Sequence, residues 1–89
     1  AMVIESKLLQ FPTDYPIKVL GRTSATLRAR SDEIVLRHAP DLDVSRVAER
    51  LSENGNFLSI SYVIRATSRE QVIALATELA ACEEVLMVI

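Results

Sequence analysis

The spacing of apolar residues predicts three strands and two helices directly. Residues 15–20 and 57–67 alternate between apolar and polar positions, which is the two-residue period of a strand with one buried face. Residues 24–39 and 68–81 repeat their apolar positions at intervals of three and four, as the buried stripe of a helix does. Residues 85–89 form a short apolar segment that predicts a last strand.

The segment between the first helix and the long strand is ambiguous. The apolar residues of segment 44–51 have helical spacing. Asn54 and Gly55, however, are a strong signal for a two-residue hairpin turn, because both turn positions need a positive φ. Since a hairpin requires a strand before its turn, we predict a strand over residues 44–53 and leave its register open.

Local signals set the ends of several elements. Pro16 lies near the start of the first strand, where a missing N–H is tolerated. Pro40 stops the first helix near Ala39. Ser68 and Gln71 have the spacing of a capping box, in which the serine hydroxyl accepts from the Gln71 amide and the Gln71 side chain reaches back to the cap.

The resulting βαββαβ order predicts an α+β, ferredoxin-like fold, with two helices on one face of a four-stranded antiparallel sheet. Residues 1–89 are expected to form one domain, in which residues 1–13 are an N-terminal arm anchored by Phe11 and residues 14–89 are the core. The two-residue period predicts which strand residues face the helices: Tyr15, Ile17, Val19, Leu58, Ile60, Tyr62, Ile64, Val85, Met87 and Ile89.

Composition narrows the function classes. The 89 residues carry a net charge of −2, which argues against attachment to nucleic acid by bulk charge. One Cys and one His cannot form a disulfide or supply a zinc site, so we expect no metal or other cofactor. The apolar runs are far shorter than the roughly 20 residues needed to span a bilayer, and no signal-peptide pattern precedes them, so we expect a cytoplasmic protein with no membrane partner.

Basic residues gather on the predicted open face of the sheet, the side away from the helices. The candidate ligand or partner face comprises Lys18, Leu20, Arg22, Arg46, Arg50, Val63 and Arg65. Arg46 and Arg50 belong to it if Val47 and Leu51 face the core. Such a face could hold an anion through charge-assisted hydrogen bonds. The competing interpretation is a solvated sheet whose long side chains cover apolar area.

A second candidate site lies where the first strand meets the first helix. Gly21, Arg22 and Thr23 form a candidate anion corner, because backbone amides at a helix N-terminus bind anions. The alternative is that Gly21 only frees the turn. His38 is expected to sit in the last helical turn, where a cation favours the helix dipole, and Cys82 to be a small, half-buried residue.

Five stretches carry a resemblance to a known family: FPTDYPIKV at 11–19, RHAP at 37–40, NGNFLS at 54–59, ATSREQ at 66–71 and VLMVI at 85–89. Together and in this order they resemble the YbeD-like family of small uncharacterised bacterial proteins. The resemblance implies an ACT-like form of the ferredoxin-like fold and a cytoplasmic protein whose suggested role is regulation connected with lipoate metabolism. Residues 42–51 depart from the family pattern, and the resemblance supplies no catalytic residue.

These features favour a non-enzymatic regulatory or adaptor domain that acts through association with a protein partner, with a homodimer as one form of that association. The alternative is a sensor of an anionic or amino-acid-like molecule around Gly21, Arg22 and Arg65. RNA binding is disfavoured because Phe57 is the single aromatic expected on the open face of the long strand. An enzyme is the poorest hypothesis, since the sequence presents no nucleophile–base pair or metal-ligand pattern.

Overall fold

The computed structural model describes residues 10–89, so residues 1–9 of the predicted arm lie outside the described part of the chain. The elements follow in the order β1 (Thr13–Arg22), α1 (Leu27–His38), the 3₁₀ turn η1 (Val44–Arg46), β2 (Ala48–Leu51), β3 (Phe57–Ala66), α2 (Arg69–Ala81) and β4 (Val85–Val88). This order confirms the predicted βαββαβ fold. Among the described residues, no helix has the length and apolar character needed to span a membrane.

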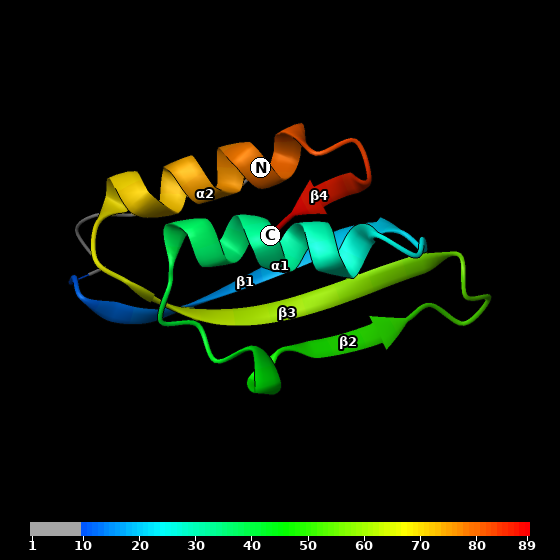
Figure 1. Ribbon diagram of the computed structural model, residues 1–89, viewed down its shortest axis with the longest axis horizontal. Helices are drawn as coiled ribbons and strands as arrows, with labels where there is room; N and C mark the ends of the chain where they lie inside the picture. Colours follow the sequence, from blue (N-terminus) through cyan, green and yellow to red (C-terminus); the bar gives the residue numbers. More distant parts are fainter. Residues whose placement is uncertain (1–9) are drawn as a thin grey trace.

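The four strands form one antiparallel sheet in the order β2-β3-β1-β4. Figure 1 shows α1 and α2 running alongside each other over the same side of this sheet. That arrangement covers one face of the sheet and, within the described residues, leaves the other face without a helix, as the sequence pattern predicts for strands that are apolar on one side only.

The two central strands, β1 and β3, pair along their full length, from Thr13 opposite Ala66 to Arg22 opposite Phe57. Residues opposite each other in a sheet share a face, so the helix-facing positions of both strands form one layer. Ile17 and Tyr62, which are opposite each other, are each only 1% exposed. The predicted core of both strands is therefore confirmed; Tyr15, near the end of the layer, is half-buried.

In β4, the predicted facing is correct for the buried Val85 and wrong for Met87 and Ile89. The register of β1 with β4 shifts between Leu20 and Gly21, so that Gly21 lies opposite Val85 whereas Leu20 lies opposite Met87. This irregularity is a β-bulge, in which one extra residue is accommodated on one strand. An extra residue inverts the facing of every residue beyond it, because the side-chain period of a strand is two.

The consequence of the bulge is an exchange of buried and open positions at the end of β4. Val88, opposite the buried Val19, packs against the core, although Met87 was predicted to do so. Ile89 exchanges two backbone hydrogen bonds with Lys18, at 3.0 and 2.8 Å, and thus shares the open side with it. Met87 and Ile89 are both exposed.

The two hydrogen bonds between Lys18 and Ile89 also explain why a proline is tolerated at position 16 of β1. The backbone of Lys18 faces β4, and the backbone of Pro16, two residues earlier, must point to the same side. Within the described residues, no strand lies beside Pro16 on that side. Its missing N–H therefore interrupts no ladder of hydrogen bonds.

The ambiguous segment contains both a helical turn and a strand. Asp43 caps η1, since its side chain accepts from the Ser45 amide at 3.1 Å and from the Ser45 hydroxyl at 2.6 Å. The strand β2 that follows has 4 residues, so the predicted strand over residues 44–53 is too long. Its register places Arg50 opposite Ser59, on the open side of the sheet, and Leu51 opposite the buried Leu58.

The predicted capping box of α2 is only half correct. The Ser68 hydroxyl accepts from the Gln71 amide at 3.1 Å, as expected. The Gln71 side chain, however, accepts from the amide of Thr67, one residue before the cap, at 2.6 Å. Its own amide group donates to the His38 carbonyl at 2.7 Å. Gln71 therefore ties the start of α2 to the end of α1.

Gly21 is required by a close approach between two backbones. A Cβ atom at this position would lie 2.5 Å from the Glu84 carbonyl oxygen and 2.8 Å from a methyl group of Leu27. Gly55 differs, because it adopts a φ of 74° in the β2–β3 turn but has open space around it. Substitutions at the two glycines therefore separate the effect of steric crowding, at Gly21, from that of backbone strain, at Gly55.

We expect Gly21→Ala to lower the free energy of unfolding by about 3 kcal/mol, because a backbone carbonyl cannot yield to the new methyl group. Gly55→Ala should cost only about 1 kcal/mol, the strain of a left-handed conformation. Urea denaturation of both variants measures the difference. Equal losses would contradict the role assigned to the Gly21 contact.

Candidate functional site

The open face of the sheet, defined as the side away from both helices, is rich in cations. The described residues include nine basic and eleven acidic side chains. By strand register, the open face holds four of these basic residues and one acidic residue: Lys18, Arg22, Arg50, Arg65 and Asp14. A chain with a net charge of −2 therefore presents a locally positive surface.

Apolar side chains lie between these cations. Val63, on the central strand β3, is 62% exposed, and Ile89 and Met87, near the end of β4, are 59% and 49% exposed. Leu20, on β1, is half-buried. The β4 bulge contributes to this surface, because it turns Met87 and Ile89 toward the open side. At the end of β4, the open face thus carries Met87 and Ile89, where the predicted alternation places Leu86 and Val88.

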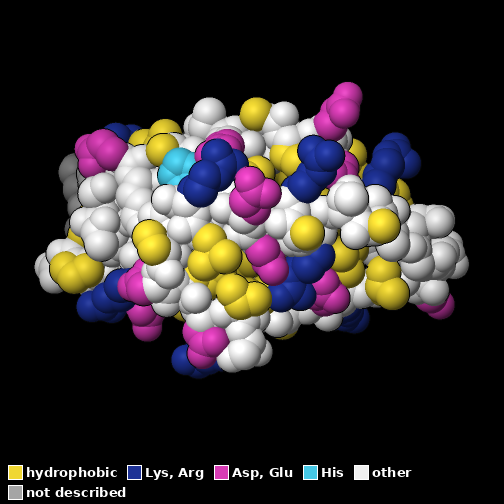
Figure 2. Space-filling model, viewed as in Figure 1, with side chains coloured by type: hydrophobic (Ala, Val, Ile, Leu, Met, Phe, Trp, Pro, Cys, Tyr) yellow, Lys and Arg dark blue, Asp and Glu magenta, His cyan; other side chains and the backbone are white. Residues whose placement is uncertain are grey.

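The cations of the two faces differ in their partners. The α1 arginines on the helix side are all paired: Arg28 with Asp32 and Glu49, Arg30 with Glu84, and Arg37 with Glu78. Figure 2 shows this helix side, with basic and acidic side chains interspersed. On the open face, Arg65 contacts Asp14 at 3.3 Å. Within residues 10–89, Lys18, Arg22 and Arg50 form no ion pair.

One end of the open face contains a shallow depression of about 120 Å³. Its lining residues are Leu20, Arg50, Leu51, Ser52, Phe57 and Ser59. The Arg22 guanidinium lies over the Phe57 ring, 6.0 Å from its centre, at a distance where a cation is attracted to the ring face. This end therefore combines an apolar hollow with two cations.

The other end opens into a cleft of about 260 Å³ beside η1. Arg46 lines this cleft and does not lie on a strand of the sheet, because it belongs to η1 and not to β2. Arg65 lines it as well, together with the three carboxylates of Asp14, Asp41 and Asp43. The structure thus separates Arg46 from the other members of the predicted face, apart from Arg65 and Val63, which line the same cleft.

The three residues of the predicted anion corner lie in different environments. Gly21 is buried beneath Glu84. Arg22 belongs to the open face, and the Thr23 amide donates to the Asn56 carbonyl at 3.0 Å. These three residues therefore do not converge on one hollow.

An internal carboxylate occupies the start of α1. Glu84, in the turn before β4, accepts from the Ser24 hydroxyl and from the Thr26 hydroxyl, the latter at 2.8 Å, and pairs with Arg30 at 2.9 Å. The hydrogen bonds from Ser24 and Thr26 lower the pKa of the Glu84 carboxyl, with the Arg30 charge assisting. Ser24, two residues before the N-cap Thr26, also accepts from the amide of Leu27, the first residue of α1, at 3.0 Å.

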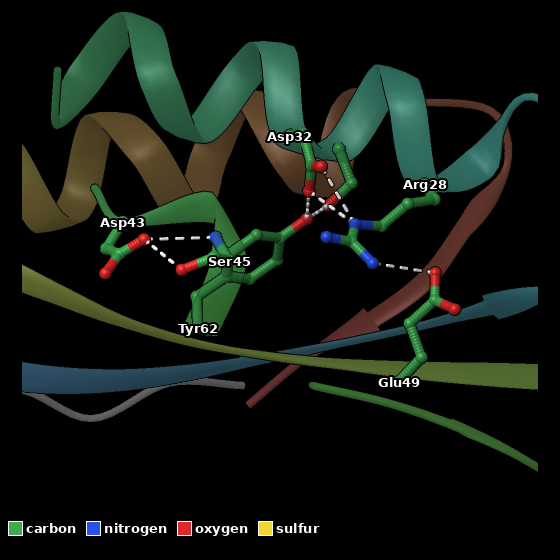
Figure 3. Close-up of polar contacts among 7 residues, drawn as sticks. Arg28, Asp32, Asp43, Ser45, Glu49 and Tyr62 are labelled. Atoms are coloured by element: carbon green, nitrogen blue, oxygen red, sulfur yellow. Dashed lines mark hydrogen bonds and ion pairs between the residues drawn. The ribbon is translucent and has the colours of Figure 1, made fainter. Parts of the chain in front are cut away.

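A polar network that the sequence did not predict joins α1 to β3 and β2 (Figure 3). The buried Tyr62 hydroxyl donates to the Asp32 carboxylate at 2.6 Å and lies 2.7 Å from the Ser31 hydroxyl. Arg28 contacts Asp32 at 2.8 Å and reaches Glu49 of β2 at 2.9 Å. Burial and the Asp32 carboxylate raise the pKa of the Tyr62 hydroxyl.

The sequence contained one signal for this network. Ser31 falls on the apolar stripe of the first helix, and Tyr62 falls on the helix-facing side of the third strand. Two polar groups predicted to enter one core need each other as partners. Arg28 and Glu49 gave no comparable signal, because charged residues on a surface helix and an edge strand are ordinary.

His38 and Cys82 lie on the helix side. His38 ends α1, as predicted, with its Nε2 2.7 Å from a Glu78 oxygen. The hydrogen bond from His38 and the charge of Arg37 lower the pKa of the Glu78 carboxyl. Cys82 is half-buried and lines a groove between α1 and α2. The described residues contain no group of three or more His, Cys, Asp and Glu side chains placed to hold a metal ion.

Two helices on one face of a β2-β3-β1-β4 sheet define a ferredoxin-like domain of the ACT-like class. The ACT domain of GTP pyrophosphokinase from Chlorobium tepidum is similar, with a TM-score of 0.67 and 13% identity over 86% of this chain and 97% of that domain. The C-terminal domain of the MgtC protein from Mycobacterium tuberculosis has a TM-score of 0.65 and 12% identity, over 92% and 89% of the two chains. These similarities establish the fold alone.

The chain belongs to the family described as "Protein of unknown function (DUF493)", whose model matches residues 6–89. It is 42% identical over 87 residues to a UPF0250 protein of Ectopseudomonas mendocina (strain ymp), covering 97% of this chain and 95% of that protein. A UPF0250 protein of Bordetella pertussis is 40% identical over 67 residues, or 75% and 74% of the two chains. The resemblance to the YbeD-like family is thereby confirmed.

We expect Tyr62→Phe to lower the free energy of unfolding by about 1–3 kcal/mol, because Asp32 and the buried Ser31 lose a partner that water cannot replace. Ser31→Ala in the Tyr62→Phe background should cost less than Ser31→Ala alone, since the two hydroxyls act as a pair. Urea denaturation of the four proteins measures both effects. Strictly additive losses would show that the two groups are independent.

We expect Glu84→Gln to destabilise the protein at pH 7 and to have a smaller effect as the pH falls. A carboxyl whose folded pKa lies below its ordinary value of 4.5 stabilises the fold above that value, and this stabilisation is lost as the pH falls through the folded pKa. Thermal denaturation between neutral and acidic pH measures the difference from wild type. The exposed neighbour Glu83 provides the control, because the stability difference between Glu83→Gln and wild type should not change in this way between neutral and acidic pH.

Proposed function

We propose that this protein is a non-enzymatic, cytoplasmic regulatory domain that acts by associating with a partner protein through the open face of its sheet. One observation carries the proposal: on that face, exposed apolar side chains lie among cations that have no acidic partner within residues 10–89. Lys18, Arg22 and Arg50 are such cations, and Val63 is the central apolar residue. Apolar surface of this kind is typical of interaction sites.

The contrast with the helix side supports this choice of face. There, Glu78 and Glu84 are held by residues of α1, so these two carboxylates already have partners within the molecule. A partner that bound the helix side would compete with these contacts. On the open face, a partner could add hydrogen bonds to the arginines without breaking internal ones, except at Arg65.

The fold class and the titratable groups support regulation rather than chemistry. The similar ACT domain from Chlorobium tepidum is part of a larger protein, a GTP pyrophosphokinase. In this chain, His38 is bound to Glu78, and Tyr62 is buried in a hydrogen-bonded network. Both groups serve the contacts that hold the helices to each other and to the sheet.

The arrangement at Gly21 weighs against a sensor of anions at that corner. The Glu84 carboxylate already accepts from Ser24 and Thr26 there. An external anion at the same place would have to displace Glu84 or lie beside its negative charge, and both cost free energy.

We expect Val63→Glu to abolish association with the native partner while the fold is retained. The change places a charge on the open face at the central strand β3, where Val63 is already 62% exposed, so its effect on stability should stay within about 0.5 kcal/mol. Affinity purification of tagged protein from a bacterium that carries the gene, with quantitative mass spectrometry, compares partner recovery between variants. Circular dichroism checks the fold.

The matched control is Ile73→Glu, which makes the same apolar-to-acidic change at a residue of α2 that is 40% exposed. Partner recovery should be as high with this variant as with the wild type. A partner recovered equally with Val63→Glu, or lost only with Ile73→Glu, would place the association on another surface and overturn the proposal.

A further inference from the structure

The depression near Leu20 and Phe57 arises because a small side chain lies between two large ones on neighbouring strands. Arg50 of β2, Ser59 of β3 and Leu20 of β1 form one row across the strands. The small Ser59 lies between two large side chains, so the surface is hollow at that point. The volume of about 120 Å³ equals roughly four water molecules at ~30 Å³ each, which gives room for one aliphatic side chain.

Two cations flank this hollow. Arg50 lines it, and Arg22 lies over Phe57, which forms another part of its wall. A guanidinium group binds a carboxylate through two parallel hydrogen bonds. Because neither arginine has an acidic partner within residues 10–89, both are available to one.

We infer that the open face binds an acidic amphipathic segment of a partner protein, with an aliphatic side chain in the hollow and carboxylates on Arg22 and Arg50. The inference rests on the proposed association through this face and specifies its chemistry. It combines apolar burial with charge-assisted hydrogen bonds in one contact. Lys18 extends the positive charge along the face, so a carboxylate elsewhere in the segment would also be attracted, whereas Arg65 is already paired with Asp14.

The charge distribution argues against a second copy of the chain as the occupant. A twofold interface places the same surface patch on itself. The open face has four cations and one acid, so two copies face to face would bring like charges together. A partner of opposite charge avoids this repulsion.

The test is an NMR titration of the ¹⁵N-labelled protein with two helical peptides. Both carry leucines at every third and fourth position, and they differ only in having glutamates or lysines beside the leucines. We expect the glutamate peptide to shift the amide signals of Leu20, Arg50 and Phe57, and the lysine peptide to shift none. Binding should weaken at about 1 M NaCl, where the Debye length is about 3 Å.

Two variants separate the contributions of charge and shape. The double variant Arg22→Glu and Arg50→Glu should lower the affinity for the glutamate peptide about tenfold or more. The control Arg69→Glu, at the start of α2, should leave that affinity unchanged. Ser59→Leu should also weaken it, because the new side chain fills the hollow without changing the charge. Circular dichroism confirms that each variant is folded.

Several results would overturn the inference: equal binding of both peptides, shifts confined to the helix side, no effect of Ser59→Leu, binding of a single-stranded RNA oligonucleotide in preference to the peptide, or a salt-resistant dimer of the protein alone. If the glutamate peptide fails while Val63→Glu still abolishes the native association, the partner is not acidic and the proposed function stands. If Val63→Glu has no effect either, both proposals fail.

Discussion

The unbroken pairing of β1 with β3 determines where most other parts of the molecule lie. Ten consecutive residue pairs fix both strands in one register, so alternate positions form two continuous layers. One layer carries the buried residues, such as Ile17 and Tyr62, on which both helices pack. The other layer carries Lys18, Val63 and the rest of the open face. A core and a positively charged outer surface therefore arise from the same alternation, and neither can shift without the other.

Polar contacts at several points then fix the helices over the buried layer. Arg28 and Asp32 tie the middle of α1 to β2 and to Tyr62 of β3. Glu84 accepts a hydrogen bond from Thr26 at the start of α1, and Gln71 donates one to the His38 carbonyl at its end. Four acidic residues, Asp32, Glu49, Glu78 and Glu84, form ion pairs on this side. This explains how an acidic protein can present a basic face, because its carboxylates are concentrated around α1 and α2.

The sequence predicted those features that depend on local periodicity. The alternation in residues 57–67 is regular enough to identify the buried layer of β3, and the cap at Ser68 is a local pattern. The errors have a different origin. A bulge beside Leu20 depends on how two distant strands meet, and the carboxylate that enters the start of α1 comes from Glu84, about sixty residues away. Such features need the tertiary structure, because no pattern within one segment contains them.

Pro16 has a consequence for how the folded protein behaves at high concentration. Among residues 10–89, the half of β1 that extends past β4 has no neighbouring strand on that side, and unpaired strand edges promote aggregation when another chain adds its own strand to them. The absence of an N–H at Pro16 removes one of the hydrogen bonds that an added strand would need. Pro16 therefore makes this edge of the sheet a poorer template for the uncontrolled addition of strands from other chains.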